Sequence, residues 1–185
     1  CRMRDTPVIV FINKMDREGQ DAFDLLDEIE SKLKIKVRPM SWPIGIGATF
    51  KGVYHMQKDE LNLFDGNKTN IEKNVIKTKG IHDQALSDLI GEEATDILKE
   101  EVELVDGVYD EFDREKYLEG KIAPVFFGSA LNNFGVQELL DSFIDISPFP
   151  QGRSTEKRTI EPDEDKFSGF VFKIHANIDP KHRDR

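Results

Sequence analysis

Two short runs of apolar residues constrain the fold of this 185-residue chain most strongly. Val8–Ile12 and Ile122–Phe127 contain mainly β-branched and aromatic residues, and each has the length of a strand that is covered on both faces. Each run leads into a loop of polar or small residues and then into apolar residues at helical spacing. This order predicts an α/β fold with a parallel sheet, whose loops gather at the carboxyl ends of the strands.

The residues between these two runs predict both helices and strands. Asp21 is placed to cap a helix that directly follows it. A β-rich region spans about 37–79, and a helical region interrupted at Gly91 spans about 83–105. Apolar residues at helical spacing over 136–144 predict one more amphipathic helix.

Composition narrows the classes of function. The net charge of −10 argues against binding a nucleic acid through its phosphates, which needs clustered Lys and Arg. No apolar run approaches the roughly 20 residues of a membrane span, so we expect no membrane association. The single Cys1 excludes an internal disulfide, no Cys/His cluster has metal-ligand spacing, and a cytoplasmic location is expected.

The composition changes after residue 147. Residues 148–166 combine three prolines and a glycine with polar and charged side chains, which predicts a linker. Beyond it, Phe170, Phe172, Ile174 and Ala176 alternate with other residues, as in a half-buried strand that opens a further domain. Because the chain starts with Cys1 close to a strand and stops within this last stretch, we expect it to be an internal piece of a longer protein.

The strongest local signal is Asn13-Lys14-Met15-Asp16, directly after the first predicted strand. The Asp16 carboxylate could accept hydrogen bonds from N1–H and the exocyclic amine of guanine, a pair of donors that adenine does not present on that edge. The Lys14 side chain could cover the purine face, and the Asn13 amide could tie loops together. The same four residues could also form an ordinary polar loop between a strand and a helix.

The second signal is Phe127-Gly128-Ser129-Ala130-Leu131, again between a strand and a helix. Small residues at Ser129 and Ala130 would let backbone N–H groups approach the guanine O6, with Leu131 packed behind them. We call Asn13–Asp16 the first base loop and Phe127–Leu131 the second base loop. The two together predict guanine recognition far more specifically than either alone.

A phosphate-binding loop of the form G-x-x-x-x-G-K-[ST] is absent from the sequence. The nearest stretch is 47–52, but Val53 and Tyr54 follow where Lys and Ser or Thr are required. These glycines are better interpreted as turn residues. The chain therefore carries candidate base-recognition loops without phosphate or magnesium ligands, and we expect it to have no catalytic residues and no activity by itself.

The two base loops match the base-recognition motifs of P-loop GTPases, and the roughly 110 residues between them resemble the insertion of elongation factor G and its relatives. Within that group the whole chain most resembles the bacterial class II peptide chain release factors. The stretches that carry this resemblance are Thr6-Pro7, Asn13–Arg17, Trp42–Gly45, Phe50–His55, Pro124–Leu131, Asn133–Val136, Phe167–Ile174 and Asp179–Arg185.

The resemblance implies the domain organisation of the chain. Residues 1–36 and 121–147 would be the last two strands and their helices in a GTPase core. Residues 37–120 would form an inserted α+β subdomain, 148–166 a linker, and 167–185 the first strand of a β-barrel domain. The phosphate loop and both switch segments would then lie upstream of Cys1.

The resemblance also implies a function for the full-length protein. It would bind GTP or GDP with Mg²⁺, act on the ribosome after peptide release, and use GTP to promote dissociation of the stop-codon-reading release factor. Two alternatives stay open. One is a GTPase of the elongation factor G or ribosome-protection type, and the other is a non-enzymatic interaction module that docks through acidic helices.

Acidic residues greatly outnumber basic ones from Glu92 to Glu119. A solvated helix face accounts for such a run as well as a docking surface does. If it is a docking surface, Glu100, Glu101 and Glu103 are the candidate contacts for a basic partner. By similarity to elongation factor G, that partner would be the ribosomal stalk protein.

Overall fold

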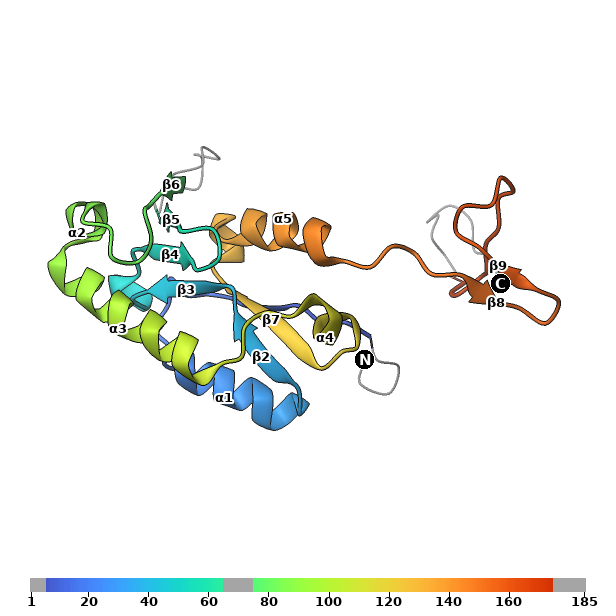
Figure 1. Cartoon of the computed structure of the whole chain (residues 1–185), viewed down its shortest axis with the longest axis horizontal. Coiled ribbons are helices and arrows are strands. Elements are labelled where there is room, and N and C mark those ends of the chain that lie inside the picture. Colours follow the sequence, from blue (N-terminus) through green and yellow to red (C-terminus); the bar gives the residue numbers. More distant parts are fainter. Residues whose placement is uncertain (1–5, 65–74, 175–185) are drawn as a thin grey trace, which may run out of the picture. The chain divides into compact units, whose positions relative to one another are not determined.

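The computed structural model describes residues 6–64 and 75–174. The chain divides into two compact units, residues 1–147 and residues 148–185. The first unit contains two sheets and the helices that cover them, and the second contains a small hairpin (Figure 1). The two units are described separately below.

A parallel sheet of three described strands forms one half of the first unit. Its order is β1-β7-β2, and β7 pairs in parallel with both neighbours. The strands are β1 (Val10–Ile12), β2 (Lys36–Pro39) and β7 (Ile122–Phe127). All six residues of β7 are buried, which confirms the strand predicted there, whereas β1 is two residues shorter than its apolar run.

The third strand of this sheet corrects the sequence-based boundaries. We expected two core strands and an inserted segment beginning at residue 37, but that boundary falls inside β2, whose residue Val37 pairs with Ala123 of β7. The sequence of β2 alternates apolar and charged residues and includes a proline, so it lacks the continuous apolar run of a central strand. It lies at the sheet edge, where a proline is tolerated.

Of the helices next to this sheet, α1 and α5 were predicted from the sequence and α4 was not. Helix α1 (Ala22–Leu33) begins at Asp21, whose side chain accepts a hydrogen bond from the Phe23 N–H at 2.8 Å. Helix α4 (Arg114–Leu118) and helix α5 (Val136–Ile146) lie on either side of β7 in the sequence. Three of the apolar residues that predicted α5, namely Leu140, Phe143 and Ile144, are exposed.

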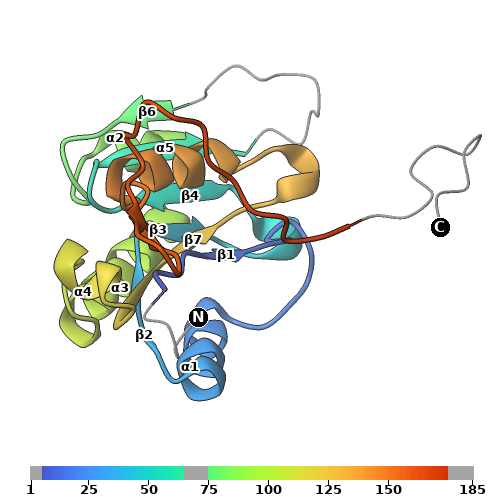
Figure 2. The same ribbon diagram turned by 90° about the vertical axis from the view of Figure 1, so that its right-hand side faces the viewer.

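An antiparallel sheet and two helices form the other half of the unit (Figure 2). The sheet has the order β3-β4-β5-β6, a meander in which each strand pairs with the next. Its strands are β3 (Ser41–Ile44), β4 (Gly52–His55), β5 (Glu60–Leu63) and β6 (Val75–Lys77). A short 3₁₀ turn, Gly47–Thr49, joins β3 to β4, and helices α2 (Ala85–Ile90) and α3 (Glu92–Val108) follow the sheet. The predicted break at Gly91 is confirmed.

The two halves share one hydrophobic core. The fully buried Trp42 of β3 lies with its ring 4.7 Å from that of Phe23 on α1 and 5.6 Å from that of Phe127 on β7. Ile12, Val125 and Phe127 of the parallel sheet belong to the same buried cluster as the residues of the antiparallel sheet and α3. Residues 37–120 therefore do not separate from the rest of the first unit as a body of their own.

The second unit differs from the sequence-based expectation. A hairpin of β8 (Arg153–Ser154) and β9 (Thr159–Ile160) lies within the segment predicted to be a linker. The strand expected to open a barrel is not formed over residues 167–174, where Phe170 and Phe172 are exposed. A strand needs a hydrogen-bonded neighbour, and none of the described residues pairs with this stretch. Ala176 and residues 179–185 lie outside the described residues.

Candidate functional site

The first base loop is held at its centre by Met15. The Met15 side chain is buried in the core, and its N–H donates to the Gly128 carbonyl at 3.1 Å. Lys14 adopts a left-handed conformation with φ 71°, and the Asn13 side-chain oxygen accepts from the Lys14 N–H at 2.8 Å. On either side of the buried Met15, Lys14 is exposed and Asp16 is partly exposed.

The second base loop is closed by a pair of backbone hydrogen bonds between Ser129 and Phe134, each 3.0 Å long. Ser129 is buried, and Asn133 takes the left-handed conformation that closes the turn. A side chain at position 128 would force its surroundings to shift, because a Cβ there would lie 2.3 Å from the Phe134 carbonyl oxygen and 2.8 Å from the Phe11 ring. Packing therefore favours glycine at this position.

Two side chains join the loops across more than a hundred residues of sequence. The Asn13 side-chain oxygen accepts a hydrogen bond from the Ala130 N–H at 2.9 Å, so this amide ties the loops together. The Asn132 amide donates both to the Asp16 carboxylate at 3.2 Å and to the Ser129 hydroxyl at 2.8 Å. Sequence reasoning missed Asn132, although its place three residues after Ser129 on a short helical turn was a usable signal.

These contacts stabilise the ionised form of Asp16. The hydrogen bond from the Ser129 hydroxyl is the main cause that lowers the pKa of the Asp16 carboxyl, and partial burial opposes it. The Asn132 amide and the charge of Arg17 lower the pKa further. A carboxylate in this environment remains an acceptor at neutral pH and can take two parallel hydrogen bonds from a neighbouring pair of donors.

The six residues predicted from the sequence thus lie in the loops at the carboxyl ends of β1 and β7. Hydrogen bonds connect Asn13 with Ala130 and, through Asn132, Asp16 with Ser129. Lys14 and Leu131 are exposed beside them, with Leu131 67% accessible, so their side chains are available to contact a ligand. The loops follow β1 and β7, which are adjacent and parallel, as expected for a ligand site in an α/β fold.

The sequence contains no phosphate-binding motif of the form G-x-x-x-x-G-K-[ST]. Gly45 and Gly47 have φ values of 76° and 61° and lie in the turn between β3 and β4, as predicted for turn residues. Within 6–64 and 75–174, no group of three or more His, Cys, Asp or Glu side chains could hold a metal ion. In the same residues no helix is long and apolar enough to cross a membrane.

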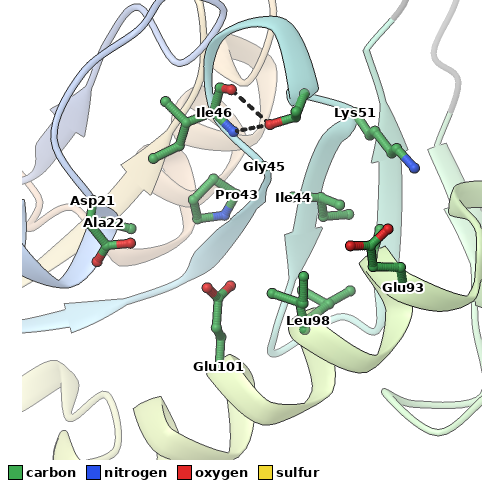
Figure 3. A pocket seen from close by; sticks show the side chains of 13 residues that line it. Asp21, Ala22, Pro43, Ile44, Gly45, Ile46, Lys51, Glu93, Leu98 and Glu101 are labelled. Atoms are coloured by element: carbon green, nitrogen blue, oxygen red, sulfur yellow. Dashed lines mark hydrogen bonds between the residues drawn. The ribbon is translucent and has the colours of Figure 1, made fainter.

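A cavity of about 410 Å³ lies beside α3 (Figure 3). Its walls are the start of α1, the end of β3 with the turn that follows, and one face of α3. In Figure 3, Glu101 and Leu98 rise from α3 toward Pro43 and Ile44. The Glu101 carboxylate accepts a hydrogen bond from the Trp42 indole N–H at 2.7 Å, and burial raises the pKa of its carboxyl.

The position of Glu101 corrects the predicted docking set. We grouped it with Glu100 and Glu103 as a contact for a partner, but only the latter two are exposed. Glu101 lies one residue before the buried Val102 and three after the buried Leu98, at the margin of the packed face of α3. Its carboxylate is therefore engaged within the fold by Trp42.

A parallel sheet with two linked polar loops at adjacent strand ends defines an α/β domain of the kind that binds ligands at the carboxyl ends of its strands. Residues 1–148 match the family model described as the elongation factor Tu GTP binding domain. The chain accordingly belongs to this family of translational GTPases.

Proposed function

We propose that this chain is the guanine-recognising part of a GTPase that acts on the ribosome in translation termination. The observation that carries the proposal is the linkage of the two base loops through Asn13 and Asn132, which leaves an ionised Asp16 at their junction. Asp16 would accept from N1–H and the exocyclic amine of guanine, and Lys14 and Leu131 would cover the two faces of the base. Backbone N–H groups near Ala130 would approach O6.

In a GTPase, GTP would supply the phosphoryl group for hydrolysis and Mg²⁺ would neutralise its charge. We identify no residues in this sequence that would bind the phosphates or Mg²⁺. The present residues would therefore bind and orient the base only. We expect the isolated chain to bind GDP more weakly than millimolar and to hydrolyse nothing. The full-length protein would be the active GTPase.

The role in termination rests on the resemblance to class II release factors, and the family match is equally compatible with a GTPase of the elongation factor G type. In the termination role, the full-length protein would promote dissociation of the stop-codon-reading release factor from the ribosome. The assay that separates the two is release-factor dissociation from termination complexes compared with translocation on elongating ribosomes. Activity in translocation alone would contradict the termination role.

Base recognition is tested by exchanging Asp16 for Asn in the full-length GTPase and titrating GDP and XDP. Guanine presents two donors to Asp16, whereas xanthine has an acceptor in place of the exocyclic amine. An amide at position 16 should therefore weaken GDP binding and strengthen XDP binding. Asp24→Asn on the exposed side of α1 is the matched control, because it makes the same charge change away from the base loops.

An inverted preference in Asp16→Asn, with the control unchanged, would support the base pocket. If neither wild type nor Asp16→Asn distinguishes the two bases, the first base loop is only a connection between strand and helix. The interaction-module alternative would then take its place, because such a module should be indifferent to guanine.

A second observation favours a protein-docking surface on the outer side of α3. Ile97, Leu104 and Val108 are large apolar residues that are 49%, 55% and 71% exposed, and the exposed Glu100 and Glu103 lie among them. An apolar stripe with acidic margins suits a partner that presents apolar and basic side chains. We propose the ribosomal stalk protein as this partner.

The docking proposal predicts that Glu100→Lys with Glu103→Lys slows ribosome-stimulated GTP turnover of the full-length protein and leaves its unstimulated turnover unchanged. Glu101 is left intact because Trp42 depends on it. Asp24→Lys with Asp27→Lys, a double reversal of exposed residues on α1, controls for the same change in net charge. Equal stimulation of all three proteins would remove the docking surface from the proposal.

A further inference from the structure

The main chain of the first base loop is fixed from two sides. On one side, the Met15 N–H donates to the Gly128 carbonyl of the second base loop at 3.1 Å. On the other, the Met15 carbonyl accepts from the Gly47 N–H at 2.9 Å, and Gly47 belongs to the turn between β3 and β4. The peptide group that leads into Asp16 is therefore held by the antiparallel sheet.

Local hydrogen bonds close the turn. The Thr49 hydroxyl donates to the Ile46 carbonyl at 2.9 Å and accepts from the Ile46 N–H at 3.2 Å, as the dashed lines in Figure 3 show. Lys51 closes the turn by donating its N–H to the Ile44 carbonyl at 2.8 Å. A turn closed by these bonds presents the Gly47 N–H in a fixed direction.

Glu18, two residues after the first base loop, provides a second connection between that part of the chain and the turn. Its carboxylate accepts from the Ala48 N–H at 3.4 Å and lies over Gly47. A Cβ on Gly47 would meet that carboxylate oxygen at 2.4 Å, and the φ of 61° is one that side chains disfavour. Glycine at 47 thus serves both the backbone conformation and the close approach of Glu18.

Residues next to strands β4 and β5 also contact Phe134, which pairs with Ser129 of the second base loop. The Phe134 ring lies 5.7 Å from that of Phe50, just after the turn, and 5.2 Å from that of Phe64, just after β5. Phe134 forms the backbone pair that closes Ser129 into place. Both base loops are consequently packed against one end of the antiparallel sheet.

We propose that the turn Gly45–Thr49 is a positioning element for guanine recognition, in which Gly47 and Glu18 fix the main chain of Met15 and hence the Asp16 carboxylate. The inference rests on the proposed guanine site. It adds to that site the turn Gly45–Thr49, which is not among the residues proposed to contact the base. It predicts that loosening the turn lowers the selectivity for guanine rather than only the stability of the fold.

Selectivity for GDP over IDP measures how well the Asp16 carboxylate is positioned, because inosine lacks the exocyclic amine and offers Asp16 one donor instead of two. In the full-length GTPase, Gly47→Ala and Glu18→Ala should each reduce the ratio of GDP to IDP affinity about two- to tenfold, the worth of one hydrogen bond. Glu18→Gln, which keeps an acceptor oxygen, should retain most of the wild-type ratio.

Gly80→Ala is the matched control for Gly47→Ala. Gly80 also has a positive φ, of 96°, but a Cβ there would meet nothing within 4 Å. The two variants share the backbone strain and differ in the contact with Glu18. If Gly47→Ala does not fold, Glu18→Ala tests the same contact without backbone strain.

Wild-type selectivity in both Gly47→Ala and Glu18→Ala would overturn the inference. A wild-type protein that binds GDP and IDP equally would instead contradict the proposed guanine site, and amide hydrogen exchange of the present chain then decides the role of the turn. Glu18→Ala should speed exchange of the Met15 N–H relative to wild type. An unchanged exchange rate would show that the turn does not hold the loop.

Discussion

His55 should make the stability of the fold fall as the pH is lowered. It lies on β4 with only 3% of its surface exposed, and neither ring nitrogen has a hydrogen-bond partner among the described residues. Burial, assisted by the charge of Lys58, lowers the pKa of His55 from 6.5 to about 4. The folded chain therefore keeps this imidazole neutral under conditions in which the unfolded chain protonates it.

The sign and size of the effect follow from proton linkage. Between about pH 6.5 and about pH 4 the unfolded state binds the additional proton, so stability is lost as the pH falls through this window. A difference of about 2.5 pKa units corresponds to about 3 kcal/mol. That is a substantial part of the 5–15 kcal/mol typical of a domain.

The perturbation is His55→Phe, which removes both unpaired nitrogens and places an apolar ring near Phe126, 6.4 Å from the native imidazole. Urea unfolding followed by Trp42 fluorescence at about pH 7 and about pH 4 measures the change in unfolding free energy. Wild type should lose about 3 kcal/mol more than His55→Phe over this interval, and the variant should be at least as stable at the higher pH.

The difference between the two proteins removes the contribution of the acidic groups to the pH dependence of stability, because these groups titrate in both proteins. Removal of the exposed His82 by His82→Ala controls for the loss of any histidine. Parallel pH profiles for wild type and His55→Phe would refute the reasoning, because they would mean that His55 gains its proton equally in the folded and unfolded chains.

Two further predictions concern packing near the base loops. Gly128→Ala should destabilise the chain by about 1–3 kcal/mol in urea unfolding, because the added Cβ would meet the Phe134 carbonyl oxygen at 2.3 Å and the backbone would have to shift. A loss below about 0.5 kcal/mol would contradict this reasoning. Trp42→Phe should lower the free energy of unfolding by about 2 kcal/mol, because it leaves a gap in the core and removes the hydrogen-bond donor of the half-buried Glu101. Glu101→Gln keeps an acceptor for the Trp42 indole and should lower it less. Equal losses in the two variants would argue against the hydrogen bond.

Local sequence patterns were sufficient for the elements and the loops that directly follow them. The apolar run before Asn13, the cap at Asp21 and the break at Gly91 each have a short-range physical cause, and the structure confirms the elements that they predict. The two base loops could be paired because parallel strands place their carboxyl ends together.

Features that depend on long-range packing could not be obtained in this way. The strand beginning at Lys36 joins the sheet only because β7 offers it a free edge, and its own residues do not resemble a core strand. His55 looks like any polar residue of a half-exposed strand until the parallel sheet covers it through Phe126. The engagement of Glu101 likewise requires Trp42, 59 residues earlier in the sequence.

The shared core sets a limit on how this domain can be shortened. Replacing residues 41–109 with a simple loop, as in a minimal GTPase, would uncover Val125 and Phe127, which now pack in one cluster with Trp42. Such a deletion would remove half of the interior rather than an appendage. Any gain or loss of this segment during divergence must therefore be accompanied by new residues on β7, and grafting it onto another GTPase should fail unless the recipient strand is changed as well.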